Sequence, residues 1–141
     1  MIERVLVGVD GSERSRRAAH FARDLVDQLG ARLVVLIAVE PPEVAALGAF
    51  DAIAIRPVHP SPDQLAEANR IAHELLLPPE RLEIRIEMGA PAEVIHRLAD
   101  ALQVDLVVVG ARGIGRTEAL LLGSVSERVV RESRRPVTVV H

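Results

Sequence analysis

The chain has 141 residues and a net charge of −3, and it contains no cysteine, tryptophan or tyrosine. This length predicts one domain, residues 1–141, large enough to bury a core without disulfides or metal ions. The lack of cysteine excludes disulfides, thiol nucleophiles and thiolate metal sites. With 17 basic residues against 20 acidic ones and an aromatic fraction of 1%, no nucleic-acid partner is expected, because basic surfaces and stacking platforms are missing.

The start of the chain lacks the features of a secretory signal. Met1–Val5 shows no charged segment that leads into an apolar core and a cleavage site. No run approaches the roughly 18 apolar residues that a membrane span needs. We therefore expect a cytoplasmic protein with no membrane partner.

The first 40 residues predict a strand, a helix and a second strand. Arg4–Val9 and Leu33–Val39 are nearly continuous apolar runs, typical of buried parallel strands. Between them a helix is expected from the N-cap Ser12 to the terminator Gly30. A strand–helix–strand unit of this length implies a right-handed crossover and a parallel sheet. The expected buried face of this helix consists of Ala18, Phe21, Ala22, Leu25, Val26 and Leu29.

The middle of the chain continues the alternation after a proline-containing connection, residues 40–60. That connection is either a functional, lid-like or partner-facing loop or an insertion-tolerant surface segment. Ser61 begins a helix with a capping box, and its expected inner face runs from Leu65 to Leu76. Leu82–Glu87 alternates between apolar and charged residues, which predicts an edge strand. A third helix begins at Pro91.

Residues 110–126 form a glycine-rich stretch after the apolar strand Leu106–Val109. Ser124, three residues before Glu127, has capping-box spacing, so a fourth helix is expected to begin there. The glycines would permit a close backbone approach or a positive φ, and a helix N-terminus attracts anions. A phosphate site is therefore predicted. The stretch is not a Walker A loop, because the sequence has no lysine, nor a G-x-G-x-x-G fingerprint, because position 118 is glutamate.

The spacing G-x2-G-x9-G-[ST], matched by Gly110, Gly113, Gly123 and Ser124, resembles the nucleotide-binding motif of the universal stress protein family, in its ATP-binding branch. The order of elements is similar to that family's over essentially the whole chain. The resemblance implies an α/β, Rossmann-like, doubly wound domain with a five-stranded parallel sheet in the order 3-2-1-4-5 and four helices. Ligands bind such sheets where the winding reverses, here between the first and fourth strands.

By this resemblance, Asp10 corresponds to the acidic residue after the first strand, and Val39 to the residue beside adenine. Arg112 is assigned to the phosphates from its charge and location. Asp10 could instead only shape an Asx-turn, and Val39 could be an ordinary core valine. The expected nucleotide-binding residues are Val9, Asp10, Val39, Val109, Gly110, Arg112, Gly113, Gly123, Ser124, Val125 and Ser126.

No catalytic or metal-binding residues are predicted. The five histidines show no short metal-binding spacing, and no G-x-S-x-G nucleophile elbow occurs. An enzymatic activity stays uncertain at this stage, with slow ATP hydrolysis as its expected limit.

The resemblance implies a nucleotide-dependent regulatory homodimer of the stress-response type. The expected ligand is ATP, with or without Mg²⁺, and AMP or ADP are alternatives. The last strand, Val137–Val140, would leave an open sheet edge that pairing with a second copy covers, and a further regulatory protein partner is expected. Two alternatives stay open: an ATP-hydrolysing or adenylyl-transferring enzyme on the same fold, and a nucleotide-free dimerisation module.

Overall fold

The computed structural model describes residues 1–40, 60–111 and 123–141, in which strands and helices alternate. The strands are β1 (Arg4–Val9), β2 (Arg32–Val39), β3 (Leu82–Met88), β4 (Leu106–Gly110) and β5 (Val137–Val140). The helices are α1 (Glu13–Leu29), α2 (Pro62–Leu75), α3 (Pro91–Ala101) and α4 (Ser124–Glu132). The predicted succession of elements is confirmed over the described residues, and none of their helices is long and apolar enough to cross a membrane.

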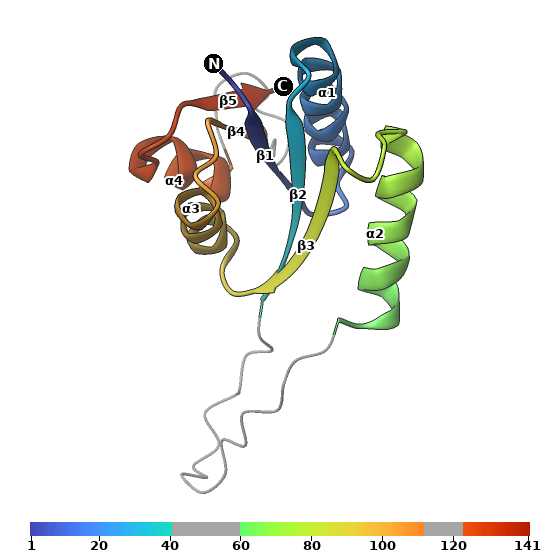
Figure 1. Cartoon of the computed structure of the whole chain (residues 1–141). Coiled ribbons are helices and arrows are strands. Elements are labelled where there is room, and N and C mark those ends of the chain that lie inside the picture. Colours follow the sequence, from blue (N-terminus) through green and yellow to red (C-terminus); the bar gives the residue numbers. More distant parts are fainter. Residues whose placement is uncertain (41–59, 112–122) are drawn as a thin grey trace, which may run out of the picture.

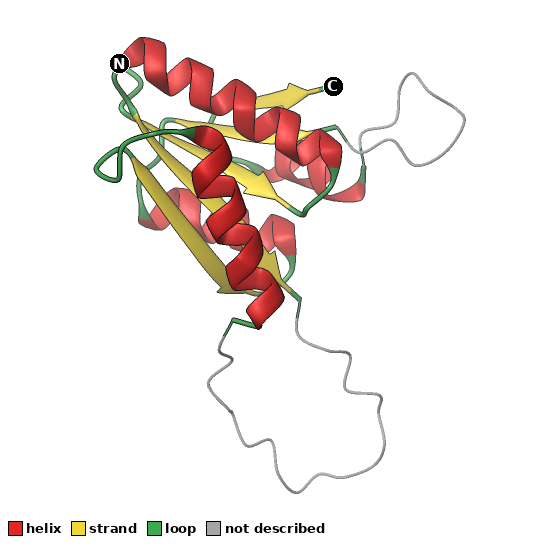
Figure 2. Cartoon of the chain, turned by 90° about the vertical axis from the view of Figure 1, so that its right-hand side faces the viewer, coloured by secondary structure: helices red, strands yellow, loops and turns green. Residues whose placement is uncertain are grey.

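The five strands form one parallel sheet in the order β3-β2-β1-β4-β5, as predicted. In the central strand β1, Val5 pairs with Leu33 of β2 on one side and with Leu106 of β4 on the other. Helices α1 and α2 cover one face of the sheet, and α3 and α4 cover the other (Figure 1). Figure 2 views the face that α1 and α2 cover. The winding therefore reverses between β1 and β4, and β3 lies at an edge as its alternating pattern predicted.

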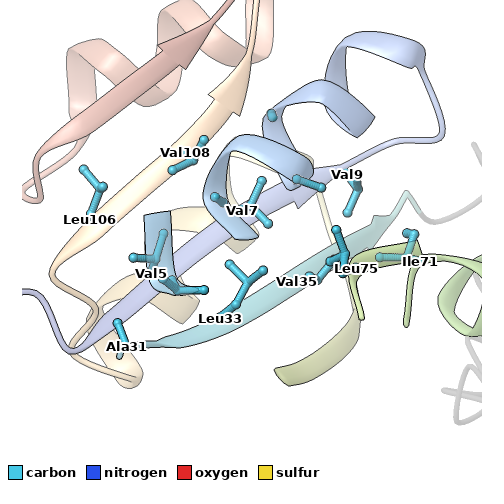
Figure 3. Close-up of a cluster of buried hydrophobic side chains, with 14 of the residues drawn as sticks. Val5, Val7, Val9, Ala31, Leu33, Val35, Ile71, Leu75, Leu106 and Val108 are labelled. Carbon is cyan, nitrogen blue, oxygen red and sulfur yellow. The ribbon is translucent and has the colours of Figure 1, made fainter. Parts of the chain in front are cut away.

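Alternate residues of the strands supply two separate cores. Val5 and Val7 of β1 pack on the side of α1 and α2, whereas Leu6 packs on the side of α3 and α4, and all three are 0% exposed. Figure 3 shows the first core, which contains side chains from β1, β2 and β4 together with Ile71 and Leu75 of α2; Leu75 lies next to Val35 of β2. Because both faces of the inner strands are covered, their sequences are continuous apolar runs rather than alternating ones.

The ends of α1 follow the predicted signals. The Ser12 hydroxyl accepts a hydrogen bond from the Ser15 backbone N–H at 3.2 Å, as an N-cap does. Gly30 ends the helix with a φ of 68°, in the left-handed region that glycine adopts readily. Ser12 thus fixes where α1 begins, close after the carboxyl end of β1, and Gly30 fixes where it ends.

The predicted buried faces of α1 and α2 are wrong at their margins. Phe21 and Leu29 of α1 are 43% and 49% exposed, and Leu65 and Leu76 beside α2 are 48% and 83% exposed. The reason is that the buried strip is narrower than the apolar periodicity suggests. In α1 that strip consists of the small or medium residues Ser15, Ala18, Ala19, Ala22 and Val26, which bring the helix close to the sheet.

Candidate functional site

A cavity of about 370 Å³ lies at the carboxyl ends of the inner strands, where the winding of the sheet reverses. Open α/β sheets bind ligands at this position. Its apolar wall includes the side chains of Leu36, Ala38, Ile95 and Val109. Its other described lining residues are Gly8, Val9, Asp10, Ser12, Arg14, Ser15, Glu40, Pro91, Gly110, Ser124, Val125 and Ser126. The cavity thus combines an apolar wall with hydroxyl groups, charged groups and helix N-termini.

The structure brings most of the predicted binding residues to this one cavity. Those that line it are Val9, Asp10, Val109, Gly110, Ser124, Val125 and Ser126. Val39 and Gly123 are chain neighbours of lining residues but do not line the cavity themselves. Arg112 and Gly113 lie outside the described residues.

Side-chain alternation explains the position of Val39. Leu36 and Ala38 of β2 line the cavity, and successive side chains of a strand point to opposite faces of the sheet. The Val39 side chain therefore points to the face that α1 and α2 cover. Its carbonyl accepts the Gly89 N–H at 2.9 Å. Because side chains two residues apart share one face of a strand, Ala38 lies on the same face as Leu36. This period would have selected Ala38 rather than Val39 as the cavity residue from the sequence.

Asp10 shapes the turn after β1 and also lines the cavity. Its Oδ1 accepts the Ser12 N–H at 2.9 Å, which is the Asx-turn left open by the sequence. Its own N–H donates to the Ser15 hydroxyl at 3.2 Å, and Gly11 between them has a φ of 83°. Asp10 lines the cavity as well, so this residue combines a structural role in the turn with a place at the candidate site.

Gly110 is required by packing between β4 and α1. A Cβ atom at this position would lie 2.8 Å from the Arg14 carbonyl oxygen and 3.1 Å from the Ser15 nitrogen. Neither Gly110 nor Gly123 has a positive φ, so that part of the expectation is wrong for both. At Gly110 the backbone of the first turn of α1 makes the close approach, and the approach of a ligand to this glycine stays a prediction.

Helix α4 begins differently from the prediction. Gly123, with φ −60° and ψ 159°, is the N-cap, and Ser124 is the first helical residue, without a side-chain capping bond. The Ser124–Glu127 capping box is therefore wrong, and the Glu127 carboxylate pairs with Arg131 at 2.6 Å instead. The physical reason is that the N-cap residue, Gly123, has no side chain and therefore no side-chain oxygen to accept an N–H of the first turn.

The uncapped first turn of α4 presents backbone donors to the cavity. The first intrahelical bond runs from the Glu127 N–H to the Gly123 carbonyl at 2.9 Å. The N–H groups of residues 124–126 precede this bond and have no intrahelical acceptor. Because these same residues line the cavity, the positive end of the helix dipole lies at its edge. This arrangement favours an anion there.

The Ser126 hydroxyl has a structural partner. The residue is 3% exposed, and its Oγ donates to the Gly110 carbonyl at 2.6 Å. Since a hydroxyl has one proton to donate, this bond leaves its oxygen only as an acceptor. The expected donation from this hydroxyl to a phosphate is not present in this arrangement, whereas Ser124 is exposed and its hydroxyl makes no such bond to Gly110.

Arg14 is a cavity residue that the sequence reasoning missed. It lies in the first turn of α1, and its Nη1 donates to the Ala111 carbonyl at 2.8 Å. Among the described lining residues it is the one cation, beside the two carboxylates of Asp10 and Glu40. Its place in the first helical turn after β1, beside the switch point, was the signal in the sequence.

The arrangement suits a ligand with an apolar planar part and an anionic part. The four apolar side chains named above can cover a planar ring, while the α4 N–H groups and one guanidinium can hold negative charge. The described residues contain no group of three or more histidine, cysteine, aspartate or glutamate side chains placed to hold a metal ion.

Comparison with known proteins gives the same family over the whole chain. The family model of the universal stress protein family matches residues 1–141. A Thermus aquaticus protein named "Universal stress protein in QAH/OAS sulfhydrylase 3'region" is 35% identical over 141 residues, covering 99% of both chains.

Two solved structures extend the comparison. A universal stress protein crystallised in complex with cAMP is 31% identical, covers 99% of this chain and 97% of its own, and has a TM-score of 0.70. A universal stress protein from Archaeoglobus fulgidus, in complex with dAMP, is 21% identical, covers 100% and 98% of the two chains, and has a TM-score of 0.63, which supports the fold alone. By its motif, its sheet order and these matches, the chain belongs to the universal stress protein family.

Proposed function

We propose that this protein binds an adenine nucleotide, with ATP as the principal ligand, in the cavity between β1 and β4. The observation that carries the proposal is the N-terminus of α4, which has no side-chain cap and whose first residues border a cavity that also has an apolar wall. Phosphate groups are held well by free N–H groups at a helix N-terminus. The nearly one-third identical relative with cAMP supports an adenine ligand of this class.

The size and charges of the cavity are compatible with this ligand. Its volume of about 370 Å³ falls within the range of small-molecule sites, about 300–1,000 Å³. Adenine would lie against the apolar wall, and the phosphates against α4. Mg²⁺ would enter bound to the phosphates, as this ion commonly does with one or two carboxylates. Asp10 and Glu40 are the described carboxylates at the cavity.

A proline substitution at the first helical position tests the α4 donors. Ser124→Pro removes both the hydroxyl and the N–H of residue 124, whereas Ser124→Ala removes only the hydroxyl. Proline fits the first turn of a helix, and the ψ of 159° at Gly123 is the conformation that a residue before proline adopts. The two variants should therefore fold alike and differ in one backbone donor.

Titration calorimetry with ATP gives the readout. A hydrogen bond to a charged group contributes about 1.5–3 kcal/mol, so Ser124→Pro should bind ATP at least about tenfold more weakly than Ser124→Ala. Equal affinities in the two variants would remove the α4 N-terminus from the site. The purified wild-type protein offers an earlier check, because a chain without tryptophan, tyrosine or cysteine leaves the absorption band of a bound adenine unobscured.

We infer further that the protein acts as a homodimer joined through β5, with nucleotide occupancy as its regulatory output. The carbonyls of Pro136 and Val140 accept the N–H groups of Val107 and Ala111 at 2.9 and 2.7 Å. Since backbone groups alternate in direction along a strand, those of Val137 and Val139 point to the open edge. A second copy of β5 can satisfy them.

Val139→Pro tests this interface, with Val139→Ala as its control. Proline removes an outward N–H without removing a bond to β4, and such a position on an edge strand tolerates proline. Both variants lose the packing of the valine side chain against the α3 and α4 core. Light scattering should show a dimer for the wild type and Val139→Ala and a monomer for Val139→Pro. A monomeric wild type at micromolar concentration contradicts the dimer.

A further inference from the structure

We propose that Arg14 is a phosphate-binding residue of this cavity and makes affinity depend on the number of phosphate groups that the nucleotide carries. The inference rests on the proposed function, and it assigns nucleoside di- and triphosphates as the preferred ligand class. Three observations support it: the free donors of the guanidinium, its position beside α4, and the charge balance of the cavity.

The guanidinium of Arg14 is only partly satisfied by the protein. It is half-buried, and one of its five N–H donors contacts the Ala111 carbonyl at 2.8 Å. Within the described residues it forms no ion pair with a carboxylate, whereas Arg17, one turn further along α1, pairs with Glu13 at 4.0 Å. A half-buried cation of this kind gains from an anionic partner.

Arg14 lies beside the same end of β4 as the N-terminus of α4. Its side chain donates to Ala111, and its backbone lies against Gly110. The Ser126 hydroxyl donates to the Gly110 carbonyl at 2.6 Å from the side of α4. The side chains of Arg14 and Ser126 therefore bond to the adjacent carbonyls of Ala111 and Gly110, so Arg14 and the first turn of α4 border the cavity at the same end of β4.

The charge balance explains why the effect should grow with ligand charge. The other charged side chains among the described lining residues are the carboxylates of Asp10 and Glu40. Arg14 supplies the one positive side-chain charge among these lining residues, and the dipole of one helix end is equivalent to only about half an elementary charge. Each additional phosphate group adds negative charge that Arg14 attracts, whereas adenosine carries none.

The test compares Arg14→Gln with the matched control Arg17→Gln on the same helix. Each protein is titrated by calorimetry with ATP, ADP, AMP and adenosine at low and moderate salt. We expect Arg14→Gln to bind ATP at least about tenfold more weakly, AMP only a few-fold more weakly, and adenosine unchanged, with a smaller salt dependence for ATP. The control should match the wild type for all four ligands.

Other results would overturn the inference. An equal loss for all four ligands would mean that Arg14 only supports Ala111, and an unchanged ATP affinity would remove Arg14 from the site. Arg14→Lys provides a second variant that keeps the charge: it should retain a preference for ATP over AMP, and a loss of that preference also contradicts the inference. Wild-type protein that binds none of the ligands contradicts the proposed function itself, and this inference with it.

Discussion

Substitution of Gly110 by alanine should destabilise the protein through a clash between two backbones. The added Cβ would lie 2.8 Å from the carbonyl oxygen and 2.9 Å from the carbonyl carbon of Arg14. These atoms belong to the first turn of α1 and cannot rotate away as the end of a side chain can. The strand and the helix must separate locally, and the buried contacts of α1 with β1 and β4 weaken as a result.

The expected loss follows from overpacking. Inserting a methyl group into a close-packed region costs about 1–3 kcal/mol, and the lower entropy of the unfolded alanine chain offsets about 0.4–1 kcal/mol of this. A net loss of about 1–2 kcal/mol corresponds to a fall in the melting temperature of about 2–8 °C for a domain of this size. The displacement of Arg14 should also lower the affinity for any ligand that this residue contacts.

Urea unfolding followed by far-ultraviolet circular dichroism measures this loss, because a chain without tryptophan or tyrosine has little intrinsic fluorescence. Gly8→Ala is the matched control in the adjacent strand: its Cβ would meet the mobile end of the Ile95 side chain at 3.2 Å. The control should lose less stability than Gly110→Ala, with similar m-values in both. A Gly110→Ala protein as stable as the control or the wild type would refute the packing argument.

Three further substitutions test other contacts. Two backbone N–H groups at the start of β1 donate to the Asp105 carboxylate and hold its pKa below the usual value. The stabilisation is therefore complete above the unfolded-state pKa, about 3.9, and is lost as the pH falls through the lower folded-state pKa. The wild type should be more stable than Asp105→Asn at neutral pH in urea titrations, and this difference should shrink in acid; a constant difference contradicts the assignment. Ser126→Ala leaves the Gly110 carbonyl without its hydroxyl donor and should cost about 1–3 kcal/mol of unfolding free energy. Gly30→Ala places a side chain at a φ of 68°. It should lower the free energy of unfolding by about 1 kcal/mol and therefore lower the thermal midpoint, whereas an unchanged midpoint would argue against a strained C-cap.

The sequence by itself determined the fold class, because each element is encoded locally. The apolar runs at Arg4–Val9 and Leu33–Val39 specify strands that are covered on both faces, and the alternation in Leu82–Glu87 specifies an edge. Ser12 and Gly30 specify the ends of α1 through their own backbone and hydroxyl chemistry. The strand order itself came from the resemblance to the family, since local patterns do not state which strands are neighbours.

Only the tertiary structure decided how the cavity is built. Periodicity placed Phe21 in the core, but the close packing of α1 leaves it 43% exposed. The spacing of Ser124 suggested a helix with a side-chain cap. The N-cap residue is instead Gly123, which has no side chain and leaves the backbone donors at the cavity. Arg14 reaches Ala111, 97 positions away in the sequence. Such contacts depend on the distance between the helices and the sheet. Packing across the whole fold sets this distance, and no local sequence pattern encodes it.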